Sequence, residues 1–303
     1  MRRLDIKIGF ACNNHCDFCA QGDKRRVQDR RSLEEISRDL EAAAATGVRG
    51  VVFTGGEPSL HPDLVRAVAA AKSRGFTSIQ IQTNGRRFAY AGFCEVLRDA
   101  GANEFSPSLH GSRPEIHDGL TRAPGAWKQV VAGIQNLKRR GLFVLTNTVV
   151  TARNFRDMPD LARLLVRLGV DQFQLAFVHI VGTAAKNAQS VVPKKSEAVP
   201  FMLEGMRIGR AAGVPCYTEA VPYCFLRGFE DCASERVMPD GPVVDLDVRL
   251  DSWEKYRVGS GKAKRPECGE CRHDSRCEGP WREYPELHGW DEFVPVGGPG
   301  ARP

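Results

Sequence analysis

The segment LDIKIGFACNNHCDFC, residues 4–19, decides how the rest of the chain is interpreted. In its first half, apolar residues alternate with polar or small ones, at Leu4, Ile6, Ile8 and Phe10. A period of two residues is typical of a β-strand. In its second half, three cysteines follow at once with the spacing C-x3-C-x2-C. The cysteine group is therefore predicted to lie on the loop after the first strand.

Downstream of this segment, predicted helices and strands alternate as far as residue 212. The first helix begins at a capping box, Ser32-Leu33-Glu34-Glu35, in which the serine and the second glutamate satisfy free backbone amides. The expected helices cover residues 32–46, 62–74, 88–101, 126–140, 159–168 and 195–212. The expected strands after the first cover residues 51–53, 78–83, 103–108, 142–150 and 171–177. These βα units predict a parallel sheet, doubly wound or a partial barrel, with its site at the carboxyl ends of the strands.

Length and composition exclude several classes of protein. The 303 residues are 42% apolar, 26% charged and 8% aromatic, which is typical of a folded chain and not of a disordered one. No run approaches the roughly 18 apolar residues that span a bilayer, and the charged start lacks the apolar block of a signal peptide. We therefore expect a cytoplasmic protein. Its ten cysteines are then expected to serve a metal, redox chemistry or core packing instead of disulfides.

The charge pattern does not demand a nucleic-acid partner. The formal net charge of +6 is mild for this length and is compatible with an anionic substrate. Basic residues are scattered through every predicted element. The densest group, Lys24-Arg25-Arg26 with Arg30-Arg31, is predicted to lie on a solvated loop.

Three cysteines so close in sequence can face one metal centre and leave one coordination position free. An iron–sulfur cluster held in this way has one iron that can take a ligand from outside the protein. The alternatives are a zinc site completed by His15, or three buried cysteines without a ligand. Structural zinc normally uses two C-x2-C-type pairs, so the spacing favours the cluster.

The stretch Cys12-Asn13-Asn14-His15-Cys16-Asp17-Phe18-Cys19 resembles the signature C-x3-C-x-aromatic-C of the radical S-adenosylmethionine (radical SAM) enzymes. The resemblance implies that Cys12, Cys16 and Cys19 bind a catalytic [4Fe–4S] cluster whose free iron holds the methionine part of SAM. It also implies that Phe18 lies beside the adenine. In that family an electron from the cluster cleaves SAM to a 5′-deoxyadenosyl radical, which abstracts hydrogen from the substrate. A flavodoxin or ferredoxin is expected to supply the electron.

A second motif, Thr54-Gly55-Gly56-Glu57-Pro58, follows the second predicted strand. Glycines allow a backbone to approach a ligand closely because they carry no Cβ atom. Taken alone, the motif is equally typical of a turn. Its place one strand after the cysteine loop resembles the GGEP motif of radical SAM enzymes, which implies that Gly55, Gly56 and Glu57 bind the amino group of SAM.

Polar residues also stand at the ends of the next strands, at Asn84, Ser106 and Ser108. Such residues often do no more than satisfy backbone groups at strand ends. The resemblance implies that the fourth strand touches the ribose and carboxylate of SAM, with Ser108 favoured over Ser106. Asn84, at the end of the third strand, is a further candidate for cofactor binding.

Three later residues are candidates for the same site. The resemblance suggests that Arg122 neutralises the cofactor carboxylate, although a surface ion pair explains it equally well. Asn147 on the fifth strand is expected to line the cavity and is grouped with the cofactor-binding residues. His179, just beyond the sixth strand, is interpreted as a satisfied core histidine rather than a cavity residue.

A second cysteine group has the spacing C-x2-C-x5-C at Cys268, Cys271 and Cys277. A zinc ribbon is the alternative interpretation. The spacing resembles the SPASM and twitch extensions of radical SAM enzymes, which implies an auxiliary [4Fe–4S] cluster. The full extension carries a fourth cysteine where this chain has Trp281, so one auxiliary cluster and the shorter twitch type are expected.

The fourth ligand of that cluster lies upstream. Cys224 is our prediction, because Pro222 fixes its approach after a predicted strand, while Cys216 and Cys232 remain alternatives. Cys94 falls at an apolar helical position and is predicted to pack in the core.

The resemblance implies an α/β fold, a (β/α)6 partial TIM barrel over residues 1–212. Residues 213–303 are expected to form a cysteine-rich twitch or SPASM-like domain with a flexible tail from Gly297.

The expected function is an oxidoreductase or bond-forming transferase acting on a small molecule: a nucleoside, a sugar, or a cofactor or natural-product precursor. Maturation of a ribosomally made peptide is the alternative. Enzymes of that kind often carry a leader-binding module, for which we see no room before Leu4. A zinc-binding, nucleic-acid-binding protein is a remote alternative, and no membrane partner is expected.

Overall fold

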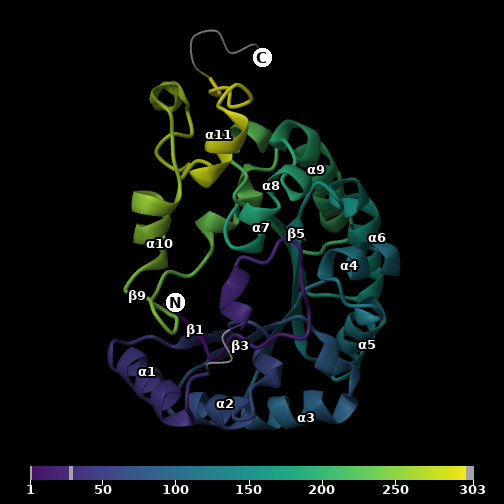
Figure 1. The fold of residues 1–303 in the computed structure, drawn as a ribbon, viewed down its shortest axis with the longest axis vertical. Coiled ribbons are helices and arrows are strands. Elements are labelled where there is room, and N and C mark those ends of the chain that lie inside the picture. The colour runs from purple at the N-terminus through teal and green to yellow at the C-terminus, as the bar shows by residue number, and fades with distance from the viewer. Residues whose placement is uncertain (1, 27–29, 298–303) are drawn as a thin grey trace.

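One twisted sheet organises the part of the chain that the computed structural model describes, residues 2–26 and 30–297 (Figure 1). In these residues it has nine strands in the order β7-β6-β5-β4-β3-β2-β1-β8-β9. Neighbours from β7 to β8 pair in parallel, and β9 pairs antiparallel with β8. The strands are β1 (Arg3–Lys7), β2 (Gly50–Thr54), β3 (Ser78–Thr83), β4 (Glu104–Pro107), β5 (Phe143–Val150), β6 (Gln172–Phe177), β7 (Cys216–Glu219), β8 (Val243–Val244) and β9 (Arg249–Leu250).

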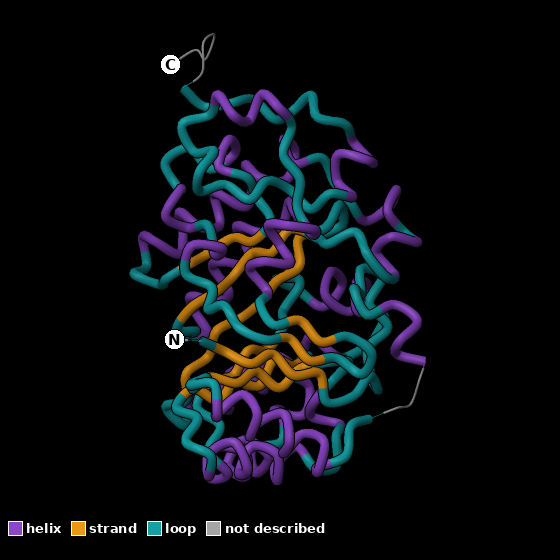
Figure 2. The backbone as a smooth tube through the Cα atoms, turned by 90° about the vertical axis from the view of Figure 1, so that its left-hand side faces the viewer, coloured by secondary structure: helices purple, strands orange, loops and turns teal. Residues whose placement is uncertain are grey.

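Helices cover the outer face of this sheet, and the strands lie inside them (Figure 2). The longer ones follow β1 to β6 in turn, as right-handed βα crossovers require. The helices are α1 (Leu33–Ala45), α2 (Leu64–Ser73), α3 (Ala91–Ala100), α4 (Pro114–Thr121), α5 (Ala126–Arg139), α6 (Met158–Leu168), α7 (Thr183–Lys186), α8 (Ala188–Val191), α9 (Lys195–Ala211), α10 (Trp253–Tyr256) and α11 (Glu283–His288). Among the described residues, none is long and apolar enough to cross a bilayer.

Local sequence signals explain where these helices begin and end. Ser32 accepts a hydrogen bond from the Glu35 amide, and Glu35 accepts one from the Ser32 amide, so the predicted capping box starts α1. Gly169 ends α6 in a left-handed conformation with φ of 70°, which favours glycine. On β1 the side chains of Leu4 and Ile6 are fully buried beneath the helices.

The predicted partial barrel of six βα units is confirmed, with three additions: α4, β7 and β8. α4 was not predicted, because it is short and begins at Pro114 without a side-chain cap. β7 adds a seventh parallel strand beside β6, while β8 joins the opposite edge beside β1. The division into residues 1–212 and 213–303 stays a prediction. Of the predicted tail, residues 298–303 lie outside the described part.

Buried ion pairs connect residues of the segment that follows β7. The side chain of Lys262 is 1% exposed, and its Nζ atom lies 2.5 Å from Glu235 and 3.0 Å from Glu278. Arg257, also buried, donates two hydrogen bonds of 2.8 and 2.9 Å to Glu278. Glu235 in turn accepts a 2.9 Å bond from the backbone amide of Ala220, just after β7. The network therefore links the cysteine-rich segment to the barrel sheet.

Replacing Lys262 by methionine is expected to lower the free energy of unfolding by about 3–5 kcal/mol, because Glu235 loses its buried counter-charge and Glu278 keeps only Arg257. Lys264→Met is the matched control. Lys264 pairs with Asp274 at 2.6 Å, but both side chains are more than a third exposed, so a change of about 0–1 kcal/mol is expected. Urea unfolding of both variants decides the matter, and equal effects would contradict a structural role for the network.

Candidate functional site

The cysteine loop lies directly after β1, at the carboxyl ends of the strands. Cys12, Cys16 and Cys19 are free thiols and partly buried. Burial raises the pKa of Cys12 and of Cys16, so these thiols are neutral unless a cationic group stabilises their thiolates. Three cysteines on one loop are a donor set that fits an iron–sulfur cluster, whose iron would stabilise the thiolates.

Two glycines fix the start of this loop. The Gly56 amide donates a 2.8 Å hydrogen bond to the Gly9 carbonyl. A Cβ atom on Gly55 would stand 2.2 Å from the Gly9 oxygen, and one on Gly56 would stand 2.2 Å from the Phe10 oxygen. The sequence suggested that these glycines let the backbone approach a ligand. In the structure, they let it approach the backbone of Gly9 and Phe10. These glycines hold the residues that precede Cys12.

Glu57 joins the ends of β2 and β3. Its Oε1 atom accepts hydrogen bonds from the Ser59 amide at 2.9 Å and the Thr83 hydroxyl at 2.7 Å. Its Oε2 atom accepts a 2.5 Å bond from the Asn84 amide. Burial raises the pKa of Glu57, and these hydrogen bonds act in the opposite direction. The Asn84 side chain donates in turn to Asn13 of the cysteine loop, at 2.6 Å.

Two other segments hold the far side of the cysteine loop. The amide of His15 donates to the Thr121 carbonyl at the end of α4, at 2.8 Å. The amide of Thr183 donates to the Cys19 carbonyl, also at 2.8 Å. A Cβ atom on Gly182 would stand 2.4 Å from the Ala20 oxygen. Elements separated by more than 150 residues therefore meet around the three cysteines.

Phe18 packs against a buried pair of histidines. Its ring meets the edge of the His110 ring at 4.8 Å, and His110 stacks on His117 at 5.6 Å between centroids. Burial lowers the pKa of His110 and, to about 4, that of His117. Both rings are therefore neutral at pH 7. They form an uncharged wall behind the aromatic position of the cysteine motif.

Arg122 lies at the surface end of α4. Its guanidinium is 68% exposed and stands 3.5 Å from Asp17, which also pairs with Arg153 at 2.7 Å. The surface ion pair that the sequence allowed is present here.

The predicted solvated loop for the basic group was wrong at Arg31, whose side chain is 11% exposed, whereas Lys24 is partly exposed but ion-paired. Lys24 pairs with Asp245 at 3.0 Å, and Arg31 pairs with Asp39, whose side chain is 7% exposed. The partners of both residues lie on other elements, which local charge density does not reveal.

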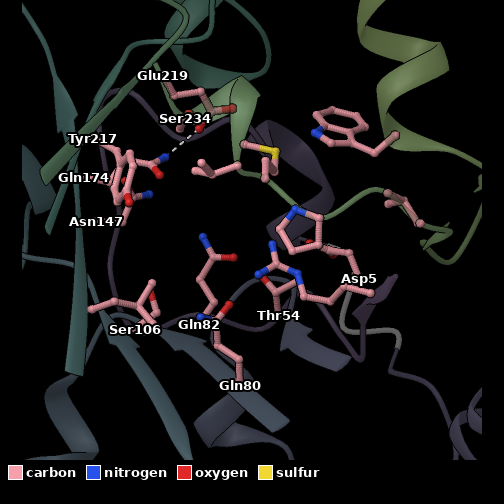
Figure 3. A pocket seen from close by; sticks show the side chains of 18 of the residues that line it. Asp5, Thr54, Gln80, Gln82, Ser106, Asn147, Gln174, Tyr217, Glu219 and Ser234 are labelled. Carbon is pink, nitrogen blue, oxygen red and sulfur yellow. Dashed lines mark hydrogen bonds between the residues drawn. The ribbon is translucent and has the colours of Figure 1, made fainter. Parts of the chain in front are cut away.

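A cavity of about 380 Å³ lies inside the barrel, next to the cysteine loop (Figure 3). Gln21, two residues after Cys19, belongs to its wall. Ser106 and Asn147 point into it, as Figure 3 shows. Ser108 lies beyond the end of β4, where its backbone forms a bridge to Asn147.

Polar residues that the sequence analysis missed line the same cavity. They occupy alternate positions of strands: Arg3, Asp5 and Lys7 on β1, Gln80 and Gln82 on β3, Gln172 and Gln174 on β6, Tyr217 and Glu219 on β7. Buried parallel strands normally read as continuous apolar runs. Polar side chains at every second position of such strands were therefore the available signal.

Cys224, on η5 (Tyr223–Phe225), lies near the second cysteine group, and the choice of these four cysteines as cluster ligands stays a prediction. Cys224, Cys268, Cys271 and Cys277 line one small cavity. Burial, together with the three neighbouring thiols, raises the pKa of Cys224 to about 12. Among the described residues, no three His, Cys, Asp or Glu side chains converge on the point where a single metal ion would sit.

The alternative ligands Cys216 and Cys232 pair with each other instead. Their thiols share a hydrogen bond, and the Arg210 Nη2 atom lies 3.2 Å from the Cys232 sulfur. The hydrogen bonds from Cys216 and Arg210 lower the pKa of Cys232. Cys94 is fully buried in the core, as expected.

Trp281 occupies the position at which the full SPASM extension has its fourth cysteine, and its ring stacks on His179. Their ring centroids are 3.9 Å apart, and the Lys262 Nζ atom lies 5.2 Å from the indole. Burial and the Lys262 charge lower the pKa of His179 to about 4. His179 therefore packs as a neutral ring in this structure.

The family model described as the radical SAM superfamily matches residues 6–175, more than half of the chain. The chain therefore belongs to the radical SAM superfamily, a family of enzymes, and the predicted membership is confirmed. Its assignment to the SPASM or twitch branch stays a prediction.

Curated relatives match about three fifths of the chain. The chain is 30% identical to a probable GTP 3′,8-cyclase of Metallosphaera sedula over 181 residues, 59% of this chain and 56% of that protein. It is 28% identical to an AdoMet-dependent heme synthase of Oleidesulfovibrio alaskensis over 200 residues, 65% of this chain and 51% of that protein. The matches thus span little more than half the length of these relatives.

Solved structures share the fold. SuiB of Streptococcus suis, bound to its precursor peptide SuiA, matches with a TM-score of 0.58 at 17% identity, over 71% of this chain and 48% of that one. Coproporphyrinogen III oxidase of Escherichia coli matches with a TM-score of 0.54 at 15% identity, over 70% and 53%. Both likenesses support the partial barrel.

Proposed function

We propose that the chain is a radical SAM enzyme that binds a [4Fe–4S] cluster through Cys12, Cys16 and Cys19 and acts on a small molecule in the barrel cavity. The observation that carries this proposal is the position of the cysteine loop, held by backbone hydrogen bonds at the carboxyl end of the sheet and beside a polar cavity. When bound, the cluster supplies the electron that splits SAM and so starts hydrogen abstraction from the substrate.

The residues around the loop would position SAM and exclude water. Gly55 and Gly56 allow the backbone before Cys12 to pack closely against them. Both oxygens of Glu57 already accept hydrogen bonds from the chain, so Glu57 would orient Asn84 beside the cysteine loop. Phe18, backed by neutral histidines, offers an apolar face to the adenine.

Further polar groups complete the proposed cofactor site. Asn84 lies against the loop, and Ser106, Ser108 and Asn147 carry polar groups along β4 and β5. To bind the cofactor carboxylate, Arg122 would have to give up its ion pair with Asp17.

A small molecule is the substrate class that we favour. The curated relatives are named as a GTP cyclase and a heme synthase, both acting on small molecules, and the chain spans about half of their length. Maturation of a ribosomally made peptide is the alternative outcome. A flavodoxin or ferredoxin is proposed as the electron donor.

Residues 213–303 are proposed to hold one auxiliary [4Fe–4S] cluster on Cys224, Cys268, Cys271 and Cys277. Their shared cavity supports this ligand set. A four-iron cluster places its own iron and sulfide atoms between the thiolates, so they need not converge on one point. Four cysteine ligands would leave no iron free for substrate and favour electron transfer.

The proposed activity is tested by cleavage of SAM. The protein is reconstituted anaerobically with iron and sulfide, then incubated with SAM and dithionite. We expect 5′-deoxyadenosine and methionine to accumulate in equal amounts, as chromatography would measure. A cluster-loaded protein that leaves SAM intact would overturn the proposal.

Cys224 and Cys232 provide a matched test of the auxiliary site. Cys224→Ala is expected to lose about four irons per chain, because one of four thiolates is gone. Cys232→Ala removes a cysteine eight residues away that contacts Cys216, so its iron content should stay unchanged. Iron, sulfide and zinc are measured on both variants. Loss of iron only from Cys232→Ala would contradict the ligand choice, and zinc in place of iron would make the site structural.

A further inference from the structure

The barrel cavity has a chemical character that narrows the substrate class. Apart from Leu145 and Val243, the strand side chains around it are carboxamides, hydroxyls and charged groups, and those labelled in Figure 3 point inward from strands between β1 and β7. The apolar part of its wall comes mainly from the later segment: Val237, Met238, Pro239, Pro242, Val243 and Trp253. A ligand here meets mostly hydrogen-bonding groups over a limited volume of about 380 Å³.

The charges in this cavity nearly balance. Its cationic side chains among the described residues are Arg3 and Lys7, and Lys7 lies 3.3 Å from Asp245. Two carboxyl groups, Asp5 and Glu219, share the wall and act electrostatically on Arg3. The chain's overall positive charge is therefore not concentrated here. Several phosphate groups would lack the clustered cations that normally bind them.

Four buried polar atoms of the cavity wall have no hydrogen-bond partner among the described residues. Asp5 Oδ1 and Asn147 Oδ1, the latter in the proposed cofactor site, are oxygens that accept, and the hydroxyls of Thr146 and Ser234 can donate or accept. Glu219 accepts one bond, from Gln174 at 2.8 Å. Burial raises the pKa of both Asp5 and Glu219, which shows how poorly this interior accommodates negative charge. A ligand hydroxyl can donate to Asp5 and can both donate to and accept from the hydroxyls of Thr146 and Ser234, whereas a phosphate, which offers only acceptors, leaves Asp5 Oδ1 without a partner.

We propose that the cavity binds a compact molecule rich in hydroxyl or amino groups and free of phosphate, such as a nucleoside or an amino sugar. This inference rests on the proposed function, because it names the substrate class of the same site. Asp5 is assigned the role of a specificity-determining residue that accepts a hydrogen bond from the ligand.

Two matched pairs of probes test the substrate class: guanosine with GTP, and glucosamine with glucosamine 6-phosphate. Binding to the full, cluster-loaded chain is measured by calorimetry in the presence of SAM. We expect at least one unphosphorylated probe to bind, and its phosphorylated partner to bind at least about tenfold more weakly. Equal or tighter binding of the phosphorylated partners, or no binding of either unphosphorylated probe, would overturn the inference.

Variants connect that result to the cavity. Asp5→Asn should weaken the unphosphorylated probe by about tenfold, the scale of one lost hydrogen bond. Glu34→Gln, on the exposed face of α1, should leave binding unchanged. Unchanged binding in Asp5→Asn would contradict the role of Asp5.

SAM binding, measured on the same samples, separates the two proposals. If SAM binds and the probes do not, only the substrate class fails. If SAM itself does not bind, the proposed function fails.

Discussion

Replacing Cys12, Cys16 and Cys19 together by alanine is expected to reduce the iron content from about eight to about four atoms per chain and to abolish SAM cleavage. The remaining four irons would belong to the auxiliary cluster. The reason is that all three proposed ligands of the catalytic cluster come from one loop, so nothing else holds it. Iron and labile sulfide are measured after anaerobic reconstitution.

Two outcomes would contradict this expectation. A triple variant that keeps all of its iron would show that the cluster binds elsewhere. Wild-type protein that contains zinc alone would remove the radical interpretation altogether. Circular dichroism of the variant provides the control, because the removal of three thiols from one loop should leave the barrel folded.

Gly56→Ala is expected to remove the catalytic cluster without touching a cysteine. Its Cβ atom would stand 2.2 Å from the Phe10 oxygen and 2.6 Å from the Ala11 oxygen, both of them backbone atoms. The chain that leads into Cys12 must therefore shift, at a cost of about 3 kcal/mol in the free energy of unfolding. We expect the iron content of this variant to fall to that of the triple cysteine variant.

Gly92→Ala is the matched control for that substitution. Gly92 lies exposed in α3, and a Cβ atom there meets nothing within 4 Å. Alanine should stabilise this helix by about 0.5–1 kcal/mol and leave the iron content unchanged. Full iron occupancy in Gly56→Ala would show that the glycine contact does not position the cysteine loop.

The barrel was predictable because its signals are local. Period-two strands, the capping box at Ser32 and glycine stops such as Gly169 lie within a few residues of the elements that they define. The cysteine motif was equally local. The partner of Gly56 was not, because the carbonyl of Phe10 lies 46 positions earlier and only the folded sheet brings the two together.

Other parts of the site depended on long-range geometry. The pairing of Lys262 with Glu235 and Glu278 leaves no periodic trace in the sequence. The polar cavity did leave one, in Gln80 and Gln82 and in their equivalents on the other strands, but strand periodicity alone does not say what the inward side chains surround.

The position of β8 bears on how the chain is made. β1 leaves the ribosome before the other strands of this sheet, yet one of its edges pairs with residues 243–244, more than 230 residues later in the chain. Throughout most of translation that edge is an unpaired row of amides and carbonyls, open to other chains. Contacts so distant in sequence also form slowly. Production of this protein should therefore depend on chaperones and on growth temperature, and truncation before β8 should favour aggregation.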